Sequence, residues 1–289
     1  MAVELHPQGP FSLEQGIAFA ESFGGASSGG VDGLFTAALV DDDGTPTAFS
    51  ARQEGETVVV EHDAALSDDR LAAHAARILS LDVDGGGLLA VADRDPVVAG
   101  LLREFPGRRP VCFPTPYEAA VWSVLSQRTS MRQAAAVKRG LAQALGERVA
   151  VGAWQGTAFP AAAVLAEAPQ LPGVGGAQRV QRLRAVAEAA ADGAFDPEVL
   201  RRFAEPEQAL GRLTEVHGIG PFAALLILTR GAGHPDVAPP TTIPRARQAL
   251  AHAYGVAEDD VDAARAAELA EPWRPYRSWV FFLLRNRAG

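Results

Sequence analysis

The chain has 289 residues, of which 48% are hydrophobic, with a formal net charge of −9 and a single cysteine, Cys112. This length supports a sizeable core in one or two domains. One cysteine excludes an internal disulfide and is too few for an iron–sulfur cluster, so we expect Cys112 to be a small buried apolar residue. The sequence shows no apolar run long enough to cross a membrane and no basic, apolar leader after Met1, so we expect a cytoplasmic protein with no membrane partner.

Acidic and basic residues are unevenly divided along the chain. Residues 1–110 hold 7 Arg and 18 acids, a net charge of −11, whereas residues 111–289 hold 18 Arg and Lys138 against 17 acids, a net charge of +2. Arginines of the second half can bind phosphates where they converge, although arginines on helices are also commonly solvated. The candidates for phosphate contacts are Arg128, Arg132, Arg245 and Arg247.

Residues 1–110 have the pattern of a small α+β domain, and we place a domain boundary at residue 110. The expected elements are two helices and three strands, over residues 12–23, 34–40, 47–53, 57–61 and 71–79. Ser12 is a favourable N-cap for the first helix. The run Asp41-Asp42-Asp43 before Gly44 is either a solvated turn between two strands or, less simply, a cluster of metal ligands.

Residues 213–224 contain the segment Val216-His217-Gly218-Ile219-Gly220-Pro221-Phe222-Ala223, which predicts two short helices joined by a tight turn. Gly218 and Gly220 can adopt positive φ at no steric cost, and Pro221 suits the first turn of the second helix. The free N–H groups of that turn then point outward and can bind a phosphate. From the glycines alone, a tight turn between helices without any ligand is the alternative.

Three further segments accompany this hairpin in a particular order, at residues 116–130, 171–193 and 273–278. The first runs from Pro116-Tyr117-Glu118 to Gln127-Arg128-Thr129, the second includes Gly173, Gly175 and Arg179, and the last is Trp273-Arg274-Pro275-Tyr276-Arg277-Ser278. With these segments the chain resembles the helix-hairpin-helix DNA glycosylases, most closely the bacterial 3-methyladenine DNA glycosylase II group. The resemblance implies a mostly helical domain over residues 111–289, preceded by the small sheet domain of residues 1–110.

The resemblance also implies a function in base excision repair: binding of double-stranded DNA by a monomer, flipping of an alkylated base, and hydrolysis of its bond to the sugar. The implied DNA-binding residues are Gln127, Arg128, Gly218, Ile219, Gly220, Phe222 and Arg245. Arg128 stands where relatives fill the gap left by the flipped base, and it either intercalates or holds a phosphate. No cofactor is implied beyond a monovalent cation, Na⁺ or K⁺, on the backbone carbonyls of Thr214, Val216 and Ile219.

The sequence departs from the family at the expected catalyst. The family places an aspartate six residues after the position of Asp236, and here that position is Thr242. A carboxylate there would stabilise the positive charge that develops on the sugar, whereas a hydroxyl carries no charge. Thr242 and Asp236 are therefore the candidate catalytic residues, with His234 as a further surrogate, and each is also explained as an ordinary loop residue.

Two other departures concern the leaving base and the reaction type. Arg285 replaces a pocket tryptophan of one family member, so stacking is lost there and a cationic methylated base would be repelled. Bifunctional relatives carry a lysine where this chain has Phe222, and Lys138 falls on a different helix. We therefore expect hydrolysis without strand-cleaving lyase activity.

Three hypotheses follow from the sequence. The first is a monofunctional DNA N-glycosylase, a hydrolase of alkylated DNA. The second is a catalytically silent relative that binds DNA or a lesion. The third is a fold retained as a partner-binding module, which predicts no binding to DNA even at low salt.

Overall fold

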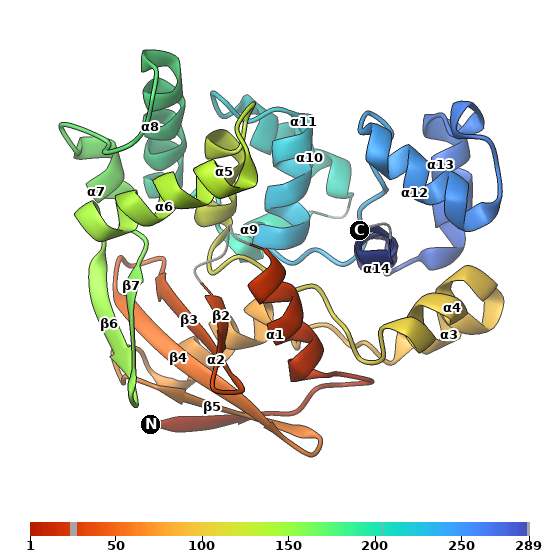
Figure 1. Cartoon of the computed structure of the whole chain (residues 1–289), viewed down its shortest axis with the longest axis horizontal. Coiled ribbons are helices and arrows are strands. Elements are labelled where there is room, and N and C mark those ends of the chain that lie inside the picture. Colours follow the sequence, from red (N-terminus) through yellow and green to blue (C-terminus); the bar gives the residue numbers. More distant parts are fainter. Residues whose placement is uncertain (24–27, 204, 288–289) are drawn as a thin grey trace.

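The computed structural model describes residues 1–23, 28–203 and 205–287 (Figure 1). The N-terminal part is a five-stranded antiparallel sheet with the strand order β1-β5-β4-β3-β2. The strands are β1 (Ala2–Leu5), β2 (Ser28–Val31), β3 (Leu34–Val40), β4 (Pro46–Glu54) and β5 (Thr57–His62). Helices α1 (Leu13–Ser22) and α2 (Asp68–Ile78) pack on this sheet and share with it a core that includes Phe35, Phe49, Leu71 and Ile78.

The expected small α+β domain is confirmed, because all five expected elements form within a few residues of their predicted bounds. Ser12 caps α1 by accepting a hydrogen bond from the N–H of Gln15. The sequence did not predict β1 or β2. Strand β2 is Ser28-Gly29-Gly30-Val31, which has little intrinsic strand preference and is extended because it pairs with β3.

The acidic run between β3 and β4 forms a turn that Asp41 holds together. The buried Asp41 carboxylate accepts hydrogen bonds from the N–H groups of Asp43 and Thr45 and pairs with Arg70 at 2.5 Å. Within the described parts of the chain, no group of His, Cys, Asp and Glu side chains is arranged to hold a metal ion. The turn interpretation therefore accounts for these residues.

The middle of the chain is helical, with α5 at its centre. The elements are α5 (Pro116–Leu125), α6 (Met131–Leu145), α7 (Ala162–Glu167), α8 (Ala177–Ala191), α9 (Pro197–Arg201), α10 (Pro206–Glu215), α11 (Pro221–Leu226) and a π-helical turn, η1 (Ile227–Gly231). Helix α5 is buried nearly all round, and its Glu118 forms a buried ion pair of 2.7 Å with Lys138 of α6. The chain's single lysine therefore lies in the core, away from the hairpin.

Two short strands interrupt these helices and were not predicted. Strands β6 (Glu147–Val151) and β7 (Trp154–Ala158) pair with each other and pack beside β3 and β4. The signal for β6 was an alternation of buried Val149 and Val151 with exposed residues, but it spans only five positions. A pattern of that length does not distinguish a strand from an irregular loop.

The C-terminal helices form a third cluster. It contains α12 (Pro244–Tyr254), α13 (Ala263–Ala270), α14 (Arg277–Arg287) and two 3₁₀ turns, η2 (Glu258–Asp260) and η3 (Glu271–Trp273), together with α3 (Gly87–Arg94) and α4 (Pro96–Glu104). Asp95 joins them, because it caps α4 and accepts hydrogen bonds from Tyr254 Oη (2.6 Å) and Trp273 Nε1 (3.0 Å). The domain boundary at residue 110 stays a prediction, since α3 and α4 precede it in sequence but share a core with the C-terminal helices.

Buried arginines fix the sheet domain to the helices. Arg77 of α2 donates hydrogen bonds to the carbonyl oxygens of Phe113 (3.1 Å), Pro114 and Gly231 (2.6 Å). These bonds satisfy a guanidinium that is only 5% exposed and hold the connecting segment against η1. In the described parts of the chain, none of the helices has the length and apolar character that crossing a bilayer requires.

Candidate nucleic-acid interface

The hairpin predicted from sequence joins α10 to α11. Gly218 has φ of +98°, and a Cβ placed on it would lie 2.8 Å from side-chain carbons of Arg182, so both conformation and space require glycine. The expectation of positive φ at Gly220 is wrong, because its φ is −96° and a Cβ there would meet open space. Pro221 begins α11 as predicted, and Ile219 is buried in the helical core.

The turn between α5 and α6 lies against this hairpin. Gln127 Nε2 donates to the carbonyl oxygen of Gly218 (3.2 Å), and Gln127 Oε1 accepts from Arg182 Nη1 (2.7 Å). Arg179 of α8 donates to the carbonyl oxygen of Gln127 and to Thr129 Oγ1, both at 2.9 Å. Gln127 thus couples the turn to the hairpin through its side-chain amide.

Arg128 is exposed and sits at the tip of that turn with φ of +52°. This left-handed conformation is uncommon for residues other than glycine. The structure therefore brings Gln127, Arg128 and Gly218 together at one edge of the helical part. The carbonyl oxygens of Thr214, Val216 and Ile219 belong to the same edge, and the monovalent cation on them stays a prediction.

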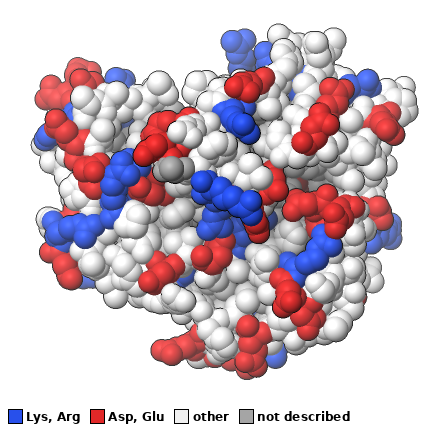
Figure 2. Space-filling model, turned by 180° about the vertical axis from the view of Figure 1, so that it is seen from behind, with Lys and Arg blue, Asp and Glu red and all other residues white. Residues whose placement is uncertain are grey.

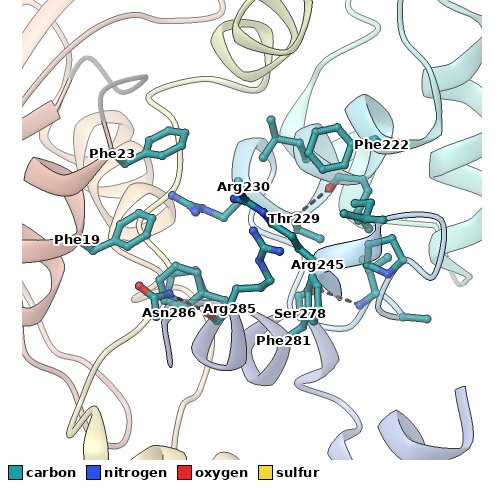
Figure 3. Close-up of a pocket in the computed structure, with 18 of the residues that line it drawn as sticks. Phe19, Phe23, Phe222, Thr229, Arg230, Arg245, Ser278, Phe281, Arg285 and Asn286 are labelled. Atoms are coloured by element: carbon teal, nitrogen blue, oxygen red, sulfur yellow. Dashed lines mark hydrogen bonds between the residues drawn. The ribbon is translucent and has the colours of Figure 1, made fainter. Parts of the chain in front are cut away.

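A cavity of about 610 Å³ opens next to the hairpin helix (Figure 3). Phe19 of α1 and Phe23, which follows that helix, lie on one side, Phe222 of α11 faces them, and Arg285 of α14 points between them. Its lining also includes residues from the loop between η1 and α12. Together with these loop residues, the other chief lining residues are Leu226, Thr229, Arg230, Val237, Pro240, Ile243, Arg245, Ser278, Phe281 and Phe282.

Arg230 lies in the wall of this cavity, and none of the acidic residues that the structure describes forms an ion pair with it. Its Nε and Nη2 donate to the carbonyl oxygen of Val111, and its guanidinium lies 4.6 Å from the ring centroid of Phe19, 5.6 Å from that of Phe23 and 5.3 Å from that of Phe282. Burial lowers the pKa of Arg230 to about 10, so the side chain keeps its charge at neutral pH. Three rings and one carbonyl surround a full positive charge.

Two more arginines reach the cavity from the C-terminal helices. Arg285 of α14 and Arg245 of α12 form no hydrogen bond or ion pair with any residue that the structure describes. Burial lowers the pKa of Arg285, and repulsion by Arg245 lowers it further. No Asp or Glu lines the cavity within the described parts of the chain, and residues 24–27, 204, 288 and 289 are Gly, Ala or Ser.

The candidate catalytic residues lie outside the cavity lining. Thr242 is exposed, although its neighbours Pro240 and Ile243 line the cavity. Asp236 is held by Arg277, with Oδ1 accepting from Nε at 2.6 Å and Oδ2 from Nη2 at 3.0 Å, and by Arg274 at 3.0 Å. This arrangement gives Asp236 a structural task and leaves its catalytic role a prediction.

His234 has a similar local explanation. Its Nδ1 accepts a hydrogen bond from the N–H of Asp236 at 3.1 Å, which stabilises the loop after η1. Burial lowers the pKa of His234, with opposing contributions from Asp236, which raises it, and from Arg201, which lowers it. His234 is thus a residue that stabilises its own loop, and its side chain does not line the cavity.

The charge on one face of the molecule is mixed. Figure 2 shows that acidic and basic side chains are interspersed on the face opposite to the view of Figure 1. Arg247 is partly neutralised by Glu258 at 3.9 Å, whereas Arg128 and Arg132 are exposed at the turn beside the hairpin. On the face in Figure 2 no broad positive patch is seen, and Arg128 and Arg132 are the exposed arginines of the described chain beside the hairpin that can contact phosphates.

Comparison with known proteins gives a consistent picture of the fold. No protein-family model matches the chain. Its sequence is 29% identical over 221 residues to the probable bifunctional transcriptional activator/DNA repair enzyme AlkA of Mycobacterium tuberculosis, covering 72% of this chain and 40% of that protein. The matched part is thus less than half the length of these curated relatives.

Solved structures match over nearly the whole chain. The 3-methyladenine DNA glycosylase from Archaeoglobus fulgidus has a TM-score of 0.77 and 20% identity, covering 99% of this chain and 98% of that one. The 8-oxoguanine glycosylase/lyase from Clostridium acetobutylicum, in a complex with double-stranded DNA, has a TM-score of 0.71 and 14% identity, covering 99% and 97%. The chain has the helix-hairpin-helix DNA glycosylase fold. The resemblance seen in the sequence is thereby confirmed.

Within this glycosylase fold, sequence reasoning identified the hairpin, the turn at Arg128 and three residues that line the cavity, Phe222, Arg245 and Arg285, but it missed Phe19, Phe23 and Arg230. Phe19 and Phe23 come from the sheet domain, about 200 residues before the π-helical turn that holds Arg230. The helical pattern of α1 indicates that Phe19 is apolar and inward, but not which element it faces. Only the packing of α1 against η1 and α14 makes these rings part of one site.

Proposed function

We propose that this chain is a monofunctional DNA N-glycosylase that acts in base excision repair. In this proposal the hairpin at Gly218 and the turn at Arg128 bind the phosphates of double-stranded DNA, and one base rotates out of the stack into the cavity beside Phe222. The observation that supports it best is the position of this cavity, which adjoins the second helix of the hairpin. A flipped base leaves the stack next to the backbone contacts, so the two features belong to one binding event.

Hydrolysis would proceed without a covalent intermediate on lysine. Position 222 is phenylalanine, and Lys138 is buried in an ion pair with Glu118 on α5. Neither supplies a free amine to the cavity. We therefore expect free base and an intact abasic strand as the products.

The weak point of catalysis is the missing carboxylate. A fixed negative charge beside the sugar contributes about 3 to 4 kcal/mol, or about a hundredfold to a thousandfold in rate, by analogy with other preorganised electrostatic groups. Thr242 lies in a loop whose neighbours line the cavity, so a carboxylate at that position would lie near the extruded nucleotide. We expect slow release of base by the wild type.

The names of the relatives suggest alkylated bases as substrates. Because three arginines and no acid line the cavity, a neutral alkylated base suits it better than a cationic one. A suitable probe is a duplex that contains 1,N6-ethenoadenine, an alkylated base without a positive charge.

The test is base release from this duplex by the wild type, by Thr242→Asp and by Thr242→Val. We expect slow release by the wild type, release about a hundredfold faster by Thr242→Asp, and no gain by Thr242→Val, which matches threonine in shape. Absence of release from all three proteins at high concentration would refute the proposal.

A second function, lesion binding without turnover, is favoured by one observation. Asp236, a candidate for the missing carboxylate, is already paired with Arg274 and Arg277 and lies outside the cavity lining. This alternative predicts that the wild type binds the ethenoadenine duplex more tightly than intact DNA but releases no base, whereas Thr242→Asp does.

A further inference from the structure

The cavity contains positive charge that nothing in the described protein neutralises. Arg230, Arg245 and Arg285 line it, whereas the acids nearest in sequence, Asp236 among them, are paired elsewhere. By contrast, Arg277, which is only 5% exposed, is paired with Asp236. The carbonyl oxygen of Val111 and three rings stabilise Arg230, but in the described parts of the chain no carboxylate offsets the charges of the three arginines, so the cavity carries excess positive charge.

The donors of these arginines are open to a ligand. Arg230 uses Nε and Nη2 on the carbonyl oxygen of Val111, which leaves Nη1 without a hydrogen bond to any residue in the described ranges. Arg285 and Arg245 make no hydrogen bonds to described residues and lie close enough to repel each other. A negatively charged group between them would relieve this repulsion and receive charge-assisted hydrogen bonds.

The walls identify the shape of that ligand. Phe19 and Phe23 on one side and Phe222 on the other provide apolar faces, and Phe222 is 54% exposed although it is a large apolar side chain. A phosphate alone would leave these rings uncovered. A flat ring would stack on them, and a volume of about 610 Å³ is in the usual range for small-molecule sites.

We propose that the cavity selects a planar heterocycle with a negative charge, such as a base that carries a carboxylate substituent, and rejects cationic bases. This inference rests on the proposed function only in assuming that the heterocycle arrives as a base extruded from DNA. Arg285 and Arg230 bind the carboxylate from within the cavity, and the exposed Arg245 binds it from the rim. The phenylalanines stack on the ring.

The experiment measures affinity by fluorescence anisotropy at one fixed salt concentration. Matched duplexes carry 5-carboxycytosine or cytosine, and 7-methylguanine or guanine, at one central position, and a fifth duplex carries an abasic analogue. We expect at least about tenfold tighter binding for 5-carboxycytosine over cytosine, the contribution of one charge-assisted hydrogen bond or more, and no gain for cationic 7-methylguanine over guanine.

Variants assign the preference to the cavity. Arg285→Gln should reduce the preference for 5-carboxycytosine to about twofold or less, while Arg265→Gln, on α13 in an exposed pair with Glu268, should retain it. Equal affinity of the wild type for 5-carboxycytosine and cytosine would overturn the inference. So would an equal loss in Arg285→Gln for every duplex, the abasic one included, because Arg285 would then be reading phosphates.

A separate arm distinguishes this inference from the proposed function. Calorimetry without DNA compares the free ring acid orotate with uracil, with inorganic phosphate as a control. Orotate binding that Arg285→Gln abolishes, in a protein that binds no duplex, would support the charge selectivity and refute the DNA function. Duplex binding without any preference for the carboxylated base or ring would leave the DNA function and overturn the inference.

Discussion

Replacement of Asp236 by asparagine tests whether this residue is a structural anchor or a catalyst. The Asp236 side chain is 14% exposed and that of Arg277 is 6% exposed, so the pair between them is largely shielded from water. Asp236→Asn keeps the shape of the side chain but removes its charge, which leaves the Arg277 guanidinium buried without a counter-ion. Breaking a buried pair in this way typically costs 3 to 5 kcal/mol, and we expect about 3 kcal/mol because one acceptor oxygen remains.

This loss converts into a shift of the unfolding temperature. With an unfolding entropy of about 2.1 cal/mol/K per residue, a chain of 289 residues has about 0.6 kcal/mol/K, so about 3 kcal/mol lowers the temperature by about 5 °C. The control is Arg274→Gln. Arg274 is 46% exposed, and after allowance for solvent screening its pair with Asp236 contributes less than about 1 kcal/mol, or under about 2 °C.

The assay combines thermal unfolding, followed by circular dichroism, with base release per folded molecule at 25 °C. We expect Asp236→Asn to unfold earlier and to retain the wild-type rate, because Asp236 does not line the cavity. An unchanged unfolding temperature together with a lost rate would refute this reasoning and would make Asp236 the missing catalyst.

Two further predictions concern the hairpin and the pH dependence of stability. Gly218→Ala should destabilise the protein by about 1 to 3 kcal/mol, because Gly218 has φ of +98° and Arg182 fills the space that a Cβ would need. Gly220 has φ of −96° and open space beside it, so Gly220→Ala should leave denaturant unfolding unchanged and weaken only DNA binding. Equal unfolding midpoints for the two variants would contradict this prediction. Burial, assisted by Arg77 and Arg70, lowers the pKa of His74 to about 4. Between about pH 6.5 and 4 the unfolded chain therefore binds one more proton than the folded chain at this residue, and the stability of the protein falls as the pH falls. The unfolding temperature of His74→Gln should fall less over this range than that of the wild type, and an identical fall would refute the prediction.

The sequence by itself determined those elements whose signals are local, namely α1, β3, β4, β5, α2 and the hairpin between α10 and α11. Ser12, the β-branched run after Glu56 and the Gly-Ile-Gly-Pro turn each act through local backbone conformation or spacing along the chain, so they could be identified without knowing what they pack against. The expected replacement of an aspartate by Thr242 rests likewise on position in a motif, and it stays a prediction. Where local preference was weak, as in β2, no strand could be predicted, because pairing with β3 is what holds this segment extended.

Only the tertiary structure decided what the site contains. Asp236 and Arg277 are 41 residues apart, so no local sequence signal indicated that the carboxylate of Asp236, a candidate catalyst, would form an ion pair with Arg277. Arg230, Arg285 and Phe19 come from three elements spread over most of the chain, and although the sequence singled out Arg285, it gave no sign that the three would meet in one cavity. These charged and aromatic side chains form a candidate site only because the fold brings them together. Electrostatic repulsion and ring stacking depend on distance in space and not on separation in sequence.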